Sequence, residues 1–142
     1  MKRIVYTRPD GGVSVVTPVG SLQEVYERSI PADATNIHEC DHTDIPADRT
    51  FRNAWAQGAA KLPEVNMPKA RDIHMDRIRE KRNAKLAELD LAYIIADENN
   101  DGPGKAAIAQ QKKKLRDLPA TYDLSGHATP DTLKDDWPIE VQ

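Results

Sequence analysis

The feature that most constrains this chain is a change in the spacing of its apolar residues near Pro68. Beyond this proline, one set of positions recurs every three or four residues: Met75, Ile78, Arg82, Leu86, Leu89, Tyr93 and Ala96. Such spacing places side chains on one side of a long α-helix. Because the pattern is weak before residue 86 and strong after it, we expect the second half of this helix to pack. The first half is expected to project outward or to meet a partner.

A second helix is predicted after a run of polar residues and glycines. Residues 97–104, with the sequence Asp-Glu-Asn-Asn-Asp-Gly-Pro-Gly, are expected to end the first helix. The positions that then share one side are Ile108, Gln111, Leu115 and Leu118, and Pro119 is expected to close the helix. Two helices joined by a short loop form an antiparallel hairpin, so residues 67–118 are predicted to be a helical hairpin.

The first 66 residues carry the signals of a small β-rich module. Residues 4–7 and 13–17 are rich in β-forming side chains and flank Arg-Pro-Asp-Gly-Gly at 8–12, which predicts a β-hairpin. Ser21 and Glu24 match a capping box, which predicts a short helix after the hairpin. Residues 36–40 are interpreted as a third short strand.

Two similar turns bracket this third strand. Residues 30–35 and 45–50 both contain Ile-Pro-Ala-Asp-x-Thr, in which proline presets a backbone angle and the aspartate can accept bonds from backbone N–H groups. Residues 51–55 then look like one helical turn with two aromatic anchors. The predicted fold class is therefore α+β: a β-hairpin with a third short strand and a short helix, followed by a long antiparallel helical hairpin.

Charge divides the chain in the same way. Residues 1–66 carry 7 basic and 9 acidic side chains, residues 67–118 carry 12 and 9, and residues 119–142 carry 1 and 5. We therefore expect three parts, the last an irregular acidic tail with Trp137-Pro138 as an anchor. A modestly basic middle between acidic ends is unlike a nucleic-acid-binding domain, which is usually strongly basic.

Several classes of protein are disfavoured by composition. The apolar run at the N-terminus ends at Arg8, which is too short for a signal peptide, and no stretch approaches the length of a membrane span. Cys40 is the one cysteine, so no internal disulfide is expected. The seven aromatic residues among 142 suit a thin core. We find no glycine-rich phosphate loop, nucleophile elbow or His-Glu-x-x-His motif, and we predict no catalytic residues and no cofactor.

Two patterns were weighed as metal sites. His38, Cys40 and His42 would share one face of an extended strand, and imidazole and thiolate are good zinc ligands, but a structural zinc site needs a fourth ligand. A partly exposed strand is the interpretation that we favour, and whether the three bind a metal stays open. Residues 97–102 match the first half of an EF-hand loop, but its twelfth position is Ile108 instead of glutamate. We interpret it as an interhelical turn and predict no metal ligands.

Two groups of basic residues could contact phosphates if the hairpin brings them together. They are Arg77, Arg79, Lys81, Arg82 and Lys85, and Lys112, Lys113, Lys114 and Arg116. No aromatic side chains alternate with them to stack on bases, and Asp76, Glu80 and Glu88 lie among them as local partners. A solvated helix surface is the better account, so nucleic acid is an unfavoured partner.

Residues 112–119, Lys-Lys-Lys-Leu-Arg-Asp-Leu-Pro, carry the most specific resemblance to a known family. Leu-Arg-Asp-Leu-Pro resembles the end of the helical hairpin in bacteriophage tail (fibre) assembly chaperones. The stretch from Arg77 through 85–90 is similar to the first helix of that hairpin, and Trp137-Pro138 to the Trp-Pro that follows it. The resemblance covers about the last half of the chain. Residues 3–12 and 45–55 also resemble small uncharacterised phage proteins.

The resemblance implies a non-enzymatic protein of phage morphogenesis, which binds tail, fibre or capsid proteins in the host cytoplasm. One alternative is a minor structural subunit that stays in the virion as a decoration, neck or tail component. Another is a phage nucleic-acid-binding protein. The sequence leaves open the partner's identity, the copy number and the oligomeric state.

Overall fold

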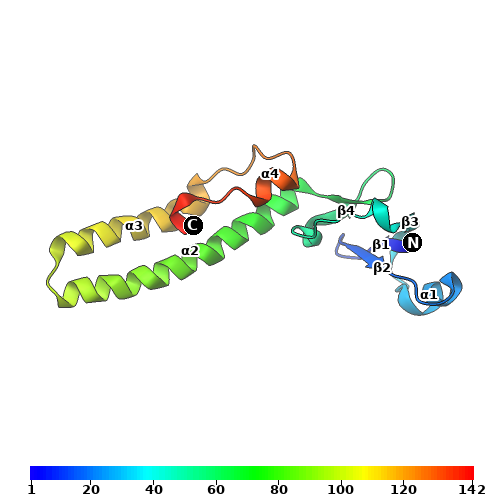
Figure 1. Cartoon of the computed structure of the whole chain (residues 1–142), viewed down its shortest axis with the longest axis horizontal. Coiled ribbons are helices and arrows are strands. Elements are labelled where there is room, and N and C mark those ends of the chain that lie inside the picture. The colour runs from blue at the N-terminus through cyan, green and yellow to red at the C-terminus, as the bar shows by residue number, and fades with distance from the viewer. The chain divides into compact units, whose positions relative to one another are not determined.

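The computed structural model describes residues 1–142 and has the α+β fold expected from the sequence (Figure 1). A three-stranded sheet near the N-terminus is followed by long helices. The chain divides into two compact units, Met1–Ala70 and Arg71–Gln142. The acidic residues 119–142 are part of the second unit.

The sheet of the first unit has the order β2-β1-β3, with both neighbours antiparallel to the central strand. Its strands are β1 (Lys2–Thr7), β2 (Val13–Val16) and β3 (Thr35–Asp41). In the turn between β1 and β2, Asp10 Oδ1 accepts from Gly12 N at 2.8 Å, and Gly11 has a φ of 81°, which suits glycine. The predicted hairpin and third strand are both confirmed.

Helix α1 (Leu22–Ser29) is joined to strand β3 by a side-chain hydrogen bond. The hydroxyl of Tyr26 on α1 donates to Glu39 Oε1 at 3.2 Å, and Glu39 stands opposite the fully buried Ile4 in the β1–β3 register. The helix begins with the expected capping box, in which Ser21 Oγ accepts from Glu24 N.

Three strand residues, Val5, Val13 and Cys40, form a buried cluster together with Trp55. Trp55 arrives there after the short 3-10 turn η2 (Arg52–Ala54), as expected for a helical turn carrying aromatic anchors. It then opens a two-stranded ribbon of β4 (Trp55–Gln57) and β5 (Pro63–Val65). This ribbon was not predicted, because strands of three residues carry too little alternation to be recognised.

The second unit is built on helices α2 (Met67–Glu98) and α3 (Gly102–Thr121), which form the predicted antiparallel hairpin (Figure 1). Asn100 takes a positive φ of 54° in the turn between them. The carboxylate of Asp101 then caps α3 by accepting from Gly104 N at 2.9 Å. A Cβ at residue 104 would lie 2.0 Å from Asp101 Oδ2, so a larger residue there would displace the capping carboxylate.

The expectation that Pro119 ends the second helix was wrong, since α3 continues to Thr121. A proline inside a helix removes one backbone hydrogen bond. The last turn is held nonetheless, because Tyr122 N donates to Leu118 O at 2.9 Å and the Thr121 hydroxyl donates to Asp117 O at 3.2 Å. Leu118 is itself buried, which adds packing to this turn.

The second half of α2 packs against α3 as expected, with Ala96 buried, but the expectation that the first half projects outward was wrong. The most deeply buried side chains of α2 in the second unit, His74 and Ile78, lie in its first half, whereas Leu91, Ile94 and Ile95 are exposed. The reason is that residues 122–142, here called the C-terminal segment, fold back onto the first half. This segment contains the short helix α4 (Pro130–Lys134) and the 3-10 turn η3 (Ile139–Val141).

None of the helices combines the length and the apolar composition that crossing a bilayer would take.

Candidate protein-binding surface

The C-terminal segment is anchored to α2 through Trp137. The indole ring packs against the imidazole of His74 with centroids 4.6 Å apart, and the ammonium of Lys81 lies 3.9 Å from the ring centroid. Arg71 adds a hydrogen bond of 2.6 Å to the carbonyl oxygen of His127. The Trp-Pro pair therefore serves as the anchor expected from the sequence, with Pro138 fully buried.

A polar cluster ties the segment to the end of α3. Asp136 accepts from the hydroxyl of Tyr122 through Oδ1 and lies 2.6 Å from His127 Nε2 through Oδ2. Burial, followed by the bond to Asp136, raises the pKa of Tyr122 to about 12. The hydrogen bond from Tyr122 is the main reason that the pKa of Asp136 is lowered from its ordinary value. Both shifts favour the bonded pair at neutral pH.

Thr132, His127 and Asp136 follow one another in hydrogen-bond contact, an order that also occurs in hydrolytic triads. Here the Thr132 hydroxyl lies 3.1 Å from Thr129 O and donates to it within the first turn of α4. The Thr132 hydroxyl therefore takes part both in the cap of α4 and in the contact with His127, and this cluster joins α4 to Asp136.

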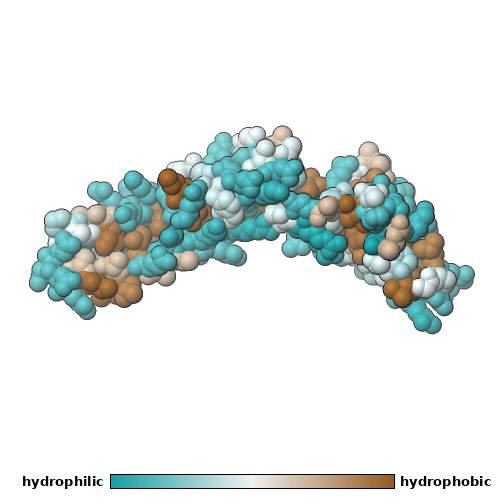
Figure 2. Space-filling model, in the orientation of Figure 1, coloured by the Kyte–Doolittle hydropathy of each residue, from teal (hydrophilic) through white to brown (hydrophobic).

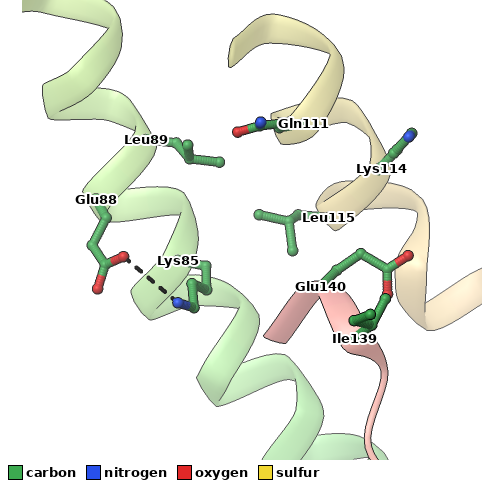
Figure 3. Close-up of a pocket in the computed structure, with 8 residues that line it drawn as sticks. All are labelled: Lys85, Glu88, Leu89, Gln111, Lys114, Leu115, Ile139 and Glu140. Carbon is green, nitrogen blue, oxygen red and sulfur yellow. Dashed lines mark ion pairs between the residues drawn. The ribbon is translucent and has the colours of Figure 1, made fainter. Parts of the chain in front are cut away.

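An apolar groove of about 460 Å³ opens where α2, α3 and η3 meet. We call it the seam groove. Figure 3 shows Leu89 on α2 and Leu115 on α3 pointing toward one another, with Ile139 of the C-terminal segment nearby. Ile139 is 80% exposed although its neighbours Pro138 and Val141 are buried. The chain therefore leaves an apolar side chain at the edge of a groove.

The rim of the seam groove carries charges of both signs. Lys85 and Glu88 form a loose ion pair of 3.9 Å on α2, and the other polar lining residues are Gln111, Lys114 and Glu140 (Figure 3). An apolar floor within a mixed rim is the usual composition of a protein-binding surface.

A second uncovered surface lies on the outer side of α2. It consists of Ala84, Ala87, Leu91, Ile94 and Ile95, and we call it the outer row. Leu91, Ile94 and Ile95 are 61%, 54% and 49% exposed. A helix turns by about 100° per residue, so Leu91 points about 200° away from Leu89, which faces α3. Figure 2 shows hydrophobic residues at the loop end of the hairpin among hydrophilic ones.

Two ion pairs join this half of α2 to α3 on the side away from the outer row. Lys112 bonds Asp90 at 2.5 Å and Lys105 bonds Asp97 at 2.6 Å, and each pair joins α3 to α2. The two pairs are seven residues apart on both helices, as one continuous antiparallel register requires. The outer row is thus displayed on a helix supported from its other side.

The metal-ligating pattern of His38, Cys40 and His42 is not assembled in the structure. Strand β3 ends at Asp41, and His42 begins the 3-10 turn η1 (His42–Asp44), so the three residues do not share one extended strand as expected. Cys40 is buried in the core of the first unit, and burial raises the pKa of its thiol. No group of three or more histidine, cysteine, aspartate or glutamate side chains is arranged to hold a metal ion.

The EF-hand-like residues also have structural roles. Asp97 pairs with Lys105 across the hairpin, and Asp101 caps α3. In the first basic group, Arg79 pairs with Asp76 at 2.7 Å and Lys85 with Glu88. These local pairs agree with the interpretation of a solvated helix surface.

Sequence reasoning missed the outer row and the seam groove. A signal for the outer row was present, because Leu91, Ile94 and Ile95 are spaced as one side of a helix. Helix α2 already packs against α3 through one apolar side. A second apolar side on the same helix therefore indicates a surface that no other part of the chain covers. Ile139 gave no such signal, since its exposure depends on how the C-terminal segment docks.

Comparison of the chain with protein-family models, curated proteins and solved structures finds no match.

Proposed function

We propose that this protein is a non-enzymatic bacteriophage morphogenesis protein that binds tail or fibre proteins, in the manner of an assembly chaperone. It would act in the host cytoplasm during particle assembly. The observation that carries the proposal is the outer row, where Leu91, Ile94 and Ile95 are exposed together on a supported helix. Contiguous exposed apolar side chains of this kind mark surfaces that bind other proteins.

The client element that fits this surface is an amphipathic helix. The outer row follows one side of α2 over residues 84–95, so a second helix can lie along it and insert its own apolar side chains. Burying a leucine or isoleucine fully contributes roughly 1.5–3 kcal/mol. Leu91, Ile94 and Ile95 are only about half exposed, so each contributes part of this amount, and the association cost is set against it. Contacts of this size suit a weak, reversible complex, as a protein that must release its client needs.

The residues that carry the family resemblance belong to the helical hairpin and to the C-terminal segment. Leu115 and Leu118, from the Leu-Arg-Asp-Leu-Pro motif, are buried side chains of α3. Trp137 and Pro138 anchor the C-terminal segment that brings Ile139 to the seam groove. The similar residues thus maintain the hairpin, and the outer row and the groove are left for the client.

The proposal is tested by co-expressing the chain with the fibre protein of the phage that encodes it. We expect the wild type to raise the yield of soluble fibre protein and Ile94→Asp to abolish the increase, because a charge in the outer row opposes apolar contact. Val19→Asp is the matched control, since Val19 is 87% exposed in the first unit. Equal yields with and without the chain would reject the client role.

Mass spectrometry of purified particles separates this role from the structural alternative. A chaperone should be present in infected cells and absent from particles. A fixed copy number relative to the tail or capsid proteins would instead identify a virion subunit and contradict the chaperone role.

A further inference from the structure

An open pocket of about 630 Å³ in the first unit is lined by three arginines. Arg3 comes from β1, while Arg49 and Arg52 come from the turns that lead into η2 and from η2 itself. No aspartate or glutamate lines it. We call it the arginine pocket.

The three guanidinium groups have no carboxylate partner in the chain. Arg3 uses one N–H to donate to the carbonyl oxygen of Lys2, at 3.2 Å, and no ion pair involves Arg49 or Arg52. Three aspartates lie near these arginines in sequence, and each accepts hydrogen bonds from its own turn; Asp48 accepts from Thr50 N and Thr50 Oγ1. Asp41 accepts from Thr43 N at 3.1 Å, and Asp44 accepts from Asp41 N at 2.9 Å. Three arginines and no carboxylate therefore line one pocket.

The backbone around the pocket is fixed before any ligand arrives. Asp48 accepts from Thr50 N at 2.8 Å, which holds the turn that carries Arg49. Arg52 lies between Phe51 and Trp55, whose side chains are both fully buried. A site whose supports are already ordered loses less conformational entropy when it binds.

The rest of the lining indicates the kind of anion. Val15, Ile45 and Pro46 add apolar surface beside the arginines. The lining has no phenylalanine, tyrosine or tryptophan to stack on a base, and its one imidazole, that of His42, lies 2.8 Å from Asp41 Oδ1. Guanidinium groups bind carboxylates through paired hydrogen bonds. We propose that the arginine pocket binds an acidic peptide segment of a partner protein, with carboxylates on Arg49 and Arg52 and a neighbouring apolar side chain on Val15 and Ile45.

The test is fluorescence anisotropy on the full chain with two labelled ten-residue peptides. One carries Glu-Leu-Glu between glycine and serine residues, and the other carries Gln-Leu-Gln in the same frame. We expect the glutamate peptide to bind at least about tenfold more tightly, because charge-assisted hydrogen bonds to arginine exceed neutral ones in strength. Arg49→Ala and Arg52→Ala should each weaken its binding by about tenfold.

Three controls keep the result specific. Arg28→Ala removes an exposed arginine of α1 outside the pocket and should leave binding unchanged. Circular dichroism should show that Arg49→Ala and Arg52→Ala are folded, as expected for exposed residues. Ile94→Asp should bind the glutamate peptide normally, so a failure of the outer row and a failure of this pocket are told apart.

Other outcomes would overturn the inference. Equal affinity for the two peptides, or an affinity indifferent to Arg49 and Arg52, would show that the pocket does not recognise carboxylates. Inorganic phosphate that binds in the pocket while neither peptide does would assign it to a free anion. A single-stranded oligonucleotide that binds there more tightly than the glutamate peptide would assign it to nucleic acid.

Discussion

His74 and Asp136 are 62 residues apart in the chain, yet the Nε2 atom of His74 lies 2.7 Å from the backbone oxygen of Asp136. The histidine is almost completely buried, with 1% of its surface exposed. This contact joins the first half of α2 to the C-terminal segment, and Trp137 packs on the same imidazole ring. The half of the helix with the weaker apolar pattern is therefore the half that the chain covers.

Replacing Trp137 with alanine should loosen the C-terminal segment. The change removes the contact with His74, the cation–π contact with Lys81 and the bond from Nε1 to Lys134 O, so we expect a loss of about 2 kcal/mol in the free energy of unfolding. Urea unfolding followed by circular dichroism measures this free energy for the variant and for the wild type. Ile139→Ala is the control and should change stability by less than about 0.5 kcal/mol. Equal effects of the two variants would contradict the anchoring role.

Tyr122 should titrate late and link stability to alkaline pH. Its pKa is raised to about 12 from an ordinary value of 10.0, mainly by burial. A folded-state pKa above the unfolded one contributes stability that is complete below pH 10 and is lost as pH rises toward 12. We expect Tyr122→Phe to remove the last step of the ultraviolet tyrosinate titration. A variant that still shows that step would assign it to another tyrosine.

Asp136 should link the same region to acid pH, with the opposite sign. Its pKa is lowered, so its contribution is complete above the unfolded value of 3.8 and is lost as pH falls through the folded value. Asp136→Asn should therefore lower the melting temperature at pH 7, with a gap to the wild type that narrows below pH 4. A gap of constant size from pH 7 to pH 3 would count against the bonded carboxylate.

An aspartate introduced between α2 and α3 should lower the stability of the second unit by an amount that depends on which helix carries it. Leu115 is 3% exposed, so Leu115→Asp buries a carboxylate without a partner and should unfold the second unit. Leu89 is only half-buried and lines the open seam groove, so Leu89→Asp should be tolerated better. Melting curves by circular dichroism compare the two. A larger loss for Leu89→Asp would show that the groove is closed in solution.

Local features of the fold were accessible from the sequence. The capping box at Ser21 and the Asp-Gly-Gly turn at 10–12 act over a few residues, so their effects can be read from the residues themselves. The helical hairpin followed from the spacing of Leu86, Leu89, Leu115 and Leu118 and from the polar loop between the helices. Pro119 does not end α3, because the turn that contains it is held by the buried Leu118 and by the bond from Tyr122 N to Leu118 O.

The candidate binding surfaces depend on contacts between distant segments. Leu91, Ile94 and Ile95 are apolar in the sequence, but their exposure depends on the C-terminal segment returning to His74 and not to the outer side of α2. Arg3 and Arg49 are 46 positions apart in the chain and line one pocket only because of the way the first unit folds. The sequence determined the β-hairpin, the cap of α1 and the two long helices, because periodicity, turn chemistry and capping are local. The tertiary structure decided which apolar and charged side chains stay uncovered, because burial depends on contacts between residues far apart in the chain.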